Sequence, residues 1–137
     1  MSVTSPIRSC FALACTIACC VVNGVAGAAE LDVASRHEIN LILTRIVHSN
    51  CEFYRSGTWH DATSAHKHID SKYRVMASRG LLGSTEDFIA QVATRSSMTN
   101  EPYAIRCPNQ AAQPSATWLL RELRVLRNPV KAGGPAR

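Results

Sequence analysis

The sequence is poor in aromatic and charged side chains and lacks any apolar run long enough to span a membrane. Of its 137 residues, 6% are aromatic and 18% are charged. Its longest apolar stretch, 9–22, has 14 residues, whereas a membrane-spanning helix needs about 20. Because 46% of the residues are hydrophobic, wholesale disorder is excluded. The length predicts a single folded domain, with no transmembrane span in the mature protein.

Motifs that would identify a reaction are missing as well. The sequence has no G-x-S-x-G turn of the kind that carries the nucleophile in α/β-hydrolases. None of its six cysteines forms the C-x-x-C pair that marks redox centres and many zinc sites. We therefore predict no cofactor and no metal site, and the sequence favours a non-catalytic protein over an enzyme.

Residues 1–28 are predicted to be a secretory signal peptide. A short polar segment precedes the apolar stretch 9–22, and Ala26-Gly27-Ala28 provides the small residues that signal peptidase requires. The pattern predicts export to the periplasm or the medium after cleavage near Ala28. Two alternatives are open, a buried N-terminal helix and a lipoprotein anchored through Cys19. The lipoprotein is the minor alternative because Thr16 stands where such signals usually have Leu.

The basic character of the sequence is concentrated at its C-terminal end. The chain has 15 Lys and Arg against 10 Asp and Glu. Without the predicted signal peptide, basic residues exceed acidic ones by four. Residues 121–137 supply this whole excess, because they contain five basic residues and one acidic residue. Since the body of the domain is neutral, we expect a solvated helix end and a flexible basic tail at 129–137. The charge therefore does not predict a nucleic-acid partner.

Hydrophobic periodicity predicts a single α+β domain over residues 29–128. Apolar residues recur at helical spacing, and Asp and Ser stand where helices should begin. The expected helices run over 32–48, from Asp61 to Gly80, from Ser84 through a short apolar segment, and from about Ser115 to Asn128. Alternating apolar residues predict strands over 51–55, 58–60 and 103–107. We expect these strands to form a three-stranded antiparallel sheet in the order 2-1-3.

Two cysteines, Cys51 and Cys107, follow the predicted signal peptide, and an exported chain favours a disulfide between them. Antiparallel pairing with Cys51 opposite Cys107 also sets Phe53 opposite Ile105 on the same face as the sulfurs. The remaining opposite pairs in this register are Glu52 with Arg106, Tyr54 with Ala104, and Arg55 with Tyr103. One register therefore satisfies the covalent, apolar and charge requirements together.

Two blocks of motifs lie in the hairpin region and around the loop before the last strand. The first combines Phe53–Gly57 with Ala65, His68, Ile69 and Lys72, and the second combines Ser84–Ile89 with Ala93–Tyr103. Over about residues 31 to 126 they resemble the YfeK-like family of small exported bacterial proteins. Ser56, in place of Asn, and Asn100, in place of Gly, depart from the family pattern at two turns. The resemblance implies export and one fold but no substrate, because no catalytic site is assigned to that family.

The candidate catalytic residues are His68, Lys72, Ser96 and Ser97. His68 and Lys72 are one helical turn apart, and a serine beside such a pair would make a nucleophilic site. The alternative is that the stems of His68 and Lys72 cover the core edge while the serines bond to local backbone. Because nothing in the spacing brings these groups together, a small periplasmic hydrolase with a Ser/Lys/His site is the second hypothesis.

Tyr54, Trp59 and Arg55 are the candidate binding residues. A two-residue turn at 56–57 places Tyr54 opposite Trp59 on the sheet face away from the disulfide. If no helix covers that face, the rings form an apolar patch typical of contact sites. Otherwise they are a cross-strand pair that only stabilises the hairpin, or one covered by the last helix. The first hypothesis for function is therefore a non-catalytic binding or accessory module of the cell envelope, with a protein or a small ligand as partner.

Overall fold

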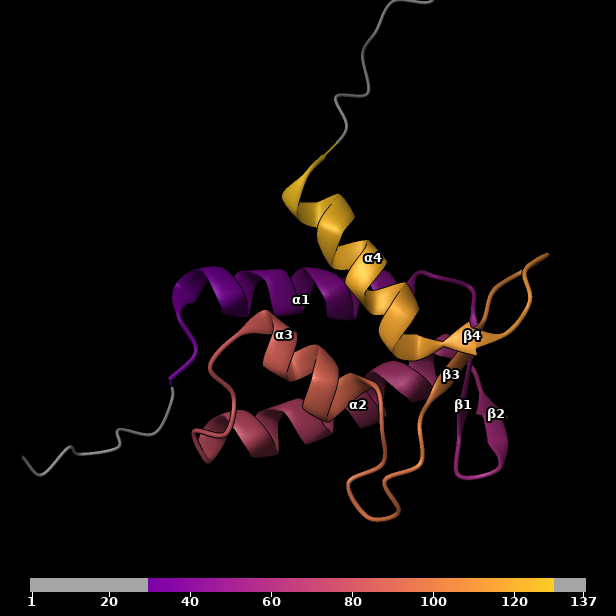
Figure 1. Ribbon diagram of the computed structural model, residues 1–137, viewed down its shortest axis with the longest axis horizontal. Coiled ribbons are helices and arrows are strands. Elements are labelled where there is room, and N and C mark those ends of the chain that lie inside the picture. Colours follow the sequence, from indigo (N-terminus) through magenta and orange to yellow (C-terminus); the bar gives the residue numbers. More distant parts are fainter. Residues whose placement is uncertain (1–29, 130–137) are drawn as a thin grey trace, which may run out of the picture.

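A computed structural model describes residues 30–129 (Figure 1). The predicted signal peptide and residues 130–137 of the predicted tail lie outside this range. In Figure 1 the strands gather at one end of the helices, and the last helix crosses beside them. The predicted α+β class is confirmed.

The helices and strands lie close to the positions that the sequence predicts. The helices are α1 (Val33–Val47), α2 (Ala62–Ser78), α3 (Thr85–Asp87), which continues directly as the π-helix η1 (Phe88–Ala93), and α4 (Ser115–Arg127). The strands are β1 (Glu52–Arg55), β2 (Thr58–His60), β3 (Ala104–Arg106) and β4 (Gln113–Pro114). Asp32, Asp61 and Ser84 precede α1, α2 and α3, and each accepts a hydrogen bond from the backbone N–H three residues later.

The sheet has four strands in the order β2-β1-β3-β4, so the prediction of three strands was wrong by one. The order of the first three strands is as predicted. The missed strand pairs Gln113 with Ile105 and Pro114 with Ala104. Two residues are too short to show strand alternation, and Pro114 has no N–H to give to a ladder, so the segment carries no strand signal. The same proline makes β4 a poor template for further pairing at that edge.

The predicted disulfide between Cys51 and Cys107 is present, and the predicted register around it is confirmed. The two Cα atoms are 4.1 Å apart. Strands β1 and β3 pair antiparallel, with Phe53 opposite Ile105. Both cysteines, Phe53, Ile105 and Tyr103 are buried. The disulfide therefore lies on the inner face of the sheet and links two segments that are 56 positions apart in the sequence.

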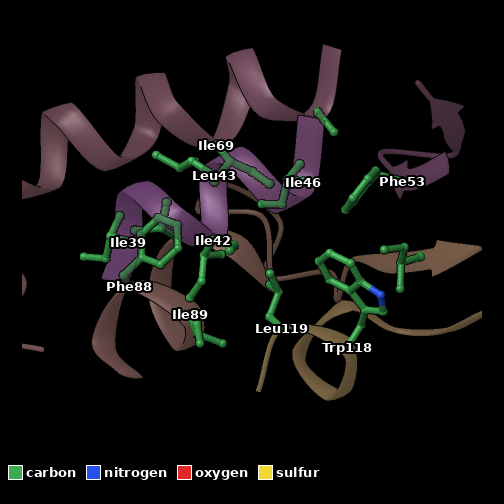
Figure 2. Close-up of a cluster of buried hydrophobic side chains, with 14 of the residues drawn as sticks. Ile39, Ile42, Leu43, Ile46, Phe53, Ile69, Phe88, Ile89, Trp118 and Leu119 are labelled. Atoms are coloured by element: carbon green, nitrogen blue, oxygen red, sulfur yellow. The ribbon is translucent and has the colours of Figure 1, made fainter. Parts of the chain in front are cut away.

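The core lies where α1, α2, η1 and α4 meet the inner face of the sheet. Figure 2 shows side chains from all of these elements converging on one interior. The fully buried residues of this cluster include Ile39, Ile42, Ile46, Phe88, Ile105 and Leu119. In α4, Trp118 meets Phe53 edge-on with ring centroids 6.3 Å apart. This contact places α4 on the inner face of the sheet.

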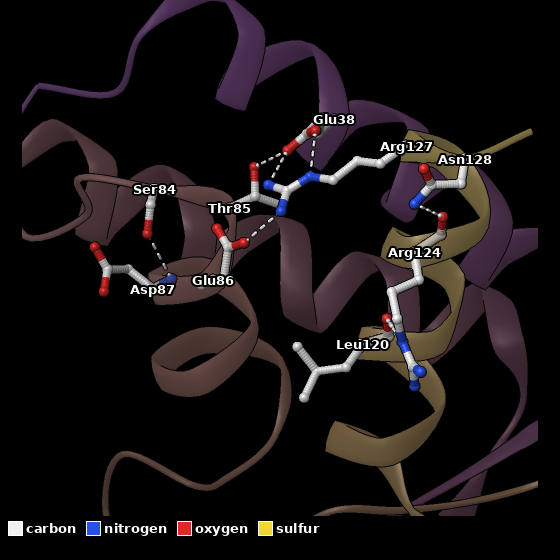
Figure 3. A network of polar contacts seen from close by, with 9 residues as sticks. All are labelled: Glu38, Ser84, Thr85, Glu86, Asp87, Leu120, Arg124, Arg127 and Asn128. Carbon is white, nitrogen blue, oxygen red and sulfur yellow. Dashed lines mark hydrogen bonds and ion pairs between the residues drawn. The ribbon is translucent and has the colours of Figure 1, made fainter.

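A polar cluster joins the last residue of α4 to α1 and α3, away from the sheet (Figure 3). Arg127, the last residue of α4, binds Glu38 of α1 at 2.8 Å and Glu86 of α3 at 2.6 Å. The hydroxyl of Thr85 donates a 2.6 Å hydrogen bond to Glu38. These contacts, led by the hydrogen bond from Arg127, lower the pKa of Glu38 to about 2. The cluster fixes the end of α4 against α1 and α3.

Candidate functional site

The hairpin between β1 and β2 turns as the sequence predicts. Ser56 and Gly57 have φ angles of 52° and 81°, and a two-residue turn with both angles positive matches the right-handed twist of its strands. The turn places Tyr54 opposite Trp59. Positive φ is uncommon for serine, so the hairpin holds Ser56 in a conformation that most residues avoid. We use the term hairpin end for residues Phe53–His60 together with the side chains of α2 that pack against them.

On the outer face of the hairpin end, Tyr54 and Trp59 form an aromatic pair. Their ring centroids are 5.3 Å apart, and both side chains are half-buried. The guanidinium of Arg106 lies 4.3 Å from the centroid of the Trp59 ring, and it also binds Glu52 at 2.6 Å. The charges on this face are therefore matched, and the stacked Arg106 fixes the orientation of the Trp59 ring.

Helix α4 does not cover the aromatic pair. Successive side chains of a strand point to opposite faces, so Phe53 and Tyr54 lie on different sides of β1. Trp118 packs on Phe53, which puts α4 on the side away from Tyr54. Among the described residues, α4 and the aromatic pair therefore lie on opposite faces of the sheet.

On the inner side of the hairpin end lies a small pocket between the hairpin and α2. Its lining residues are Phe53, Tyr54, Arg55, His60, Ala65, His68, Ile69 and Tyr103. The walls are mostly apolar, and the cavity itself measures about 20 Å³. That volume holds about one water molecule or one methyl group. The pocket is too small to enclose a substrate, so it accepts only the end of a larger group.

The polar groups of this pocket are centred on His68 and Tyr103. Nε2 of His68 and the hydroxyl of Tyr103 are 3.2 Å apart, and their rings meet edge-on. Burial, followed by the positive charges of Arg55, Lys72 and His60, lowers the pKa of His68. Burial raises the pKa of Tyr103, which Arg55 opposes. At neutral pH the pocket therefore holds a neutral His68 and a protonated Tyr103 beside the fixed charge of Arg55.

Lys72 has a structural task in the same region. Its ammonium group donates hydrogen bonds to the carbonyl oxygens of Val92 at 3.1 Å and Arg95 at 2.7 Å. Carbonyl groups at the end of a helix lack N–H partners of their own, so Lys72 caps η1 from the neighbouring helix. Burial, followed by the charge of Arg95, lowers the pKa of Lys72.

The two candidate serines lie in the loop after η1. The hydroxyl of Ser96 accepts hydrogen bonds from the backbone N–H groups of Met98 and Thr99. Ser96 and Ser97 line a separate, open depression that includes neither His68 nor Lys72. Within residues 30–129, neither serine hydrogen bonds to either of those two side chains.

The structure thus brings Arg55 and His68 together at one pocket and keeps the two serines apart from it. From the sequence alone, neither His60 nor Tyr103 was predicted to line this pocket. A signal was present, because alternation from Phe53 places Arg55 and His60 on the inner face and Tyr103 opposite Arg55. What the sequence lacked was the position of α2, which closes the pocket with His68.

Within the same described range, no three His, Cys, Asp or Glu side chains gather into a group that could hold a metal ion. No helix of residues 30–129 has the length and apolar character needed to cross a membrane. A comparison with protein families matches residues 33–127 to a family of unknown function, DUF5329. Neither the curated proteins nor the solved structures include a match to the chain.

Proposed function

The chain belongs to DUF5329, a family of unknown function, and from its own geometry we propose that it is a non-catalytic binding module of the cell envelope. The binding surface is the hairpin end, with Tyr54, Arg55 and Trp59 as its contact residues, and the partner is an envelope protein. The observation that carries the proposal is the half-buried pair of Tyr54 and Trp59 on the face of the hairpin opposite α4.

The chemistry of these side chains supports a protein partner. Tyrosine, tryptophan and arginine are the residues that most often supply the binding energy of protein interfaces. An aromatic pair whose rings are already in contact loses little conformational freedom on binding. A small-molecule partner is less well supported, because the pocket at the hairpin end measures about 20 Å³.

The rigidity of the hairpin also supports this proposal. β1 is the central partner of both β2 and β3, and the disulfide ties the start of β1 to the end of β3. A binding surface on such a hairpin keeps its shape before the partner arrives, which reduces the entropy cost of association.

We propose in addition that residues 1–28 direct export and are removed near Ala28. The disulfide supports export, since such bonds persist mainly in oxidising compartments. The resemblance to a family of exported proteins supports export too. Mass spectrometry of the protein purified from the producing bacterium should give a chain that begins at Ala29. An uncleaved chain, or a lipid attached to Cys19, would contradict the cleavage.

The binding role is tested by co-purification from the periplasm with tagged wild type, Trp59→Ala and Leu120→Ala. Leu120 is 42% exposed on α4 and serves as the matched apolar control. A protein recovered with wild type is then purified and its affinity measured directly. We expect Trp59→Ala to weaken binding about tenfold or more, as hot-spot residues do, and Leu120→Ala to leave it unchanged. Equal binding by both variants would refute the proposed surface.

A further inference from the structure

We propose that the pocket on the inner side of the hairpin end binds a carboxylate carried on a short apolar group of the partner. Arg55, His60 and His68 would face the carboxylate, and the apolar wall formed by Phe53, Ala65 and Ile69 would receive the group that bears it. This inference rests on the proposed function and adds the chemical class of the group that is recognised.

The guanidinium of Arg55 gives the pocket a positive charge. Arg55 lines the pocket together with His60 and His68, and the lining includes no Asp or Glu. Within residues 30–129 the guanidinium of Arg55 has no ion pair, whereas Arg106 on the outer face is paired with Glu52. The nearest acid along the chain to His60 is Asp61, which accepts hydrogen bonds from Ser64 and whose pKa the positive charge of His60 helps to lower, so the charge that lacks a partner within the described residues is that of Arg55. An incoming anion would therefore supply the missing counter-charge.

The pocket is small and its walls are mostly apolar. A cavity of about 20 Å³ takes a methyl-sized end of a ligand and leaves the remainder outside. Arg55 and His60 come from the hairpin and the half-buried His68 from α2, while Phe53, Ala65 and Ile69 supply the apolar wall. A short branched chain bearing a carboxylate matches this arrangement, and a bare inorganic ion does not use the apolar wall.

Hydrogen-bonding groups of Tyr103, His68 and Arg55 lie in the lining of the pocket. Tyr103 keeps its proton and bonds with Nε2 of His68 across 3.2 Å. The planar guanidinium of Arg55 can bind both oxygens of a carboxylate at once. The guanidinium of Arg55 supplies the main attraction, and the imidazoles of His68 and His60 lie beside it in the lining.

The test uses the purified full-length mature protein, with isovalerate as the probe and its neutral isostere isovaleramide as the control. Titrations are followed through the imidazole NMR signals of His68 and His60. We expect saturable shifts with isovalerate and at least tenfold weaker binding of isovaleramide and of inorganic phosphate. Equal binding of the amide, equal binding of phosphate, or no saturable shift would overturn the proposal.

Matched variants separate the pocket from general charge effects. Arg55→Gln should weaken isovalerate binding about tenfold, because one charge-assisted interaction is lost. Arg79→Gln removes the same charge at the far end of α2, where Arg79 is exposed, and should leave binding unchanged. An equal loss in both variants would refute the site. Since this titration needs no partner protein, its failure beside a partner that responds to Trp59→Ala would reject the carboxylate pocket alone.

Discussion

The ammonium nitrogen of Lys72 lies 2.7 Å from the carbonyl oxygen of Arg95 and so ties helix α2 to the end of the π-helix. A second hydrogen bond reaches the carbonyl of Val92 at 3.1 Å. This lysine would have been the natural base for a serine nucleophile, yet two of its three protons are donated to the backbone. Its contacts help to hold the end of η1 against α2, beside the hydrogen bond from Ser115 to the carbonyl of Ala93.

Replacing Lys72 by methionine should therefore destabilise the protein. The variant keeps the apolar stem but leaves two carbonyl groups without this donor, at a cost of about 1–2 kcal/mol. Urea unfolding, followed by circular dichroism, measures the change in the free energy of unfolding. Lys67→Met, at an exposed position of the same helix, should change it by less than about 0.5 kcal/mol. Equal effects of the two substitutions would show that Lys72 has no capping role.

The disulfide should contribute a large share of the stability. On the chain-entropy model, closing a loop across 56 positions stabilises the fold by about 4 kcal/mol, and measured values are commonly about 2–4 kcal/mol. The double variant Cys51→Ser, Cys107→Ser should lower the free energy of unfolding by that amount. Dithiothreitol should destabilise wild type and leave the double variant unaffected. A wild type insensitive to complete reduction would contradict the expectation.

The cluster of Arg127 with Glu38 should make stability depend on acidity. The pKa of Glu38 is lowered from 4.5 to about 2 in the folded protein, so its contribution is present above pH 4.5. It is lost as the pH falls from about 4.5 to about 2, because protonation of Glu38 breaks the interaction. The guanidinium side chain is 43% exposed, so solvent screening limits the contribution to about 1 kcal/mol.

Arg127→Gln should accordingly lower stability by about 1 kcal/mol at pH 7 and flatten its decline between pH 4.5 and 2. Arg124→Gln, one turn earlier on α4, is the matched control, since within the described residues the guanidinium of Arg124 hydrogen bonds only to the backbone carbonyl of Leu120. Urea midpoints at several pH values provide the comparison. If the stability of Arg127→Gln falls with decreasing pH as much as that of wild type, Arg127 is not the cause of the lowered pKa of Glu38.

The sheet register was predictable because three independent constraints coincide in it. The pairing that joins Cys51 to Cys107 also buries Phe53 against Ile105, and a shift by one residue would reverse both faces. No comparable constraint marks Pro114 as part of a strand. Pro114 belongs to a strand only because β3 lies beside it, and that contact depends on the tertiary fold.

The candidate site likewise combines features that the sequence predicts with features that depend on the tertiary fold. The pairing of Tyr54 with Trp59 follows from strand alternation and a two-residue turn, and both are local properties. The pocket depends on how α2 docks against the hairpin, which brings His68 to Tyr103 across 35 positions of sequence. The sequence predicted a short helix from Ser84 but not that its second part, η1, is a π-helix.

The central claim, that the hairpin end is the contact surface, is tested most directly by photocrosslinking in the producing cell. A benzophenone amino acid is placed at position 59 in one variant and at position 120 of α4 in another. The account predicts one adduct of defined mass from position 59, none from position 120, and direct binding of the adduct's partner to the purified protein. Adducts of equal yield from both positions, or a partner whose affinity is the same for wild type and Trp59→Ala, would contradict it.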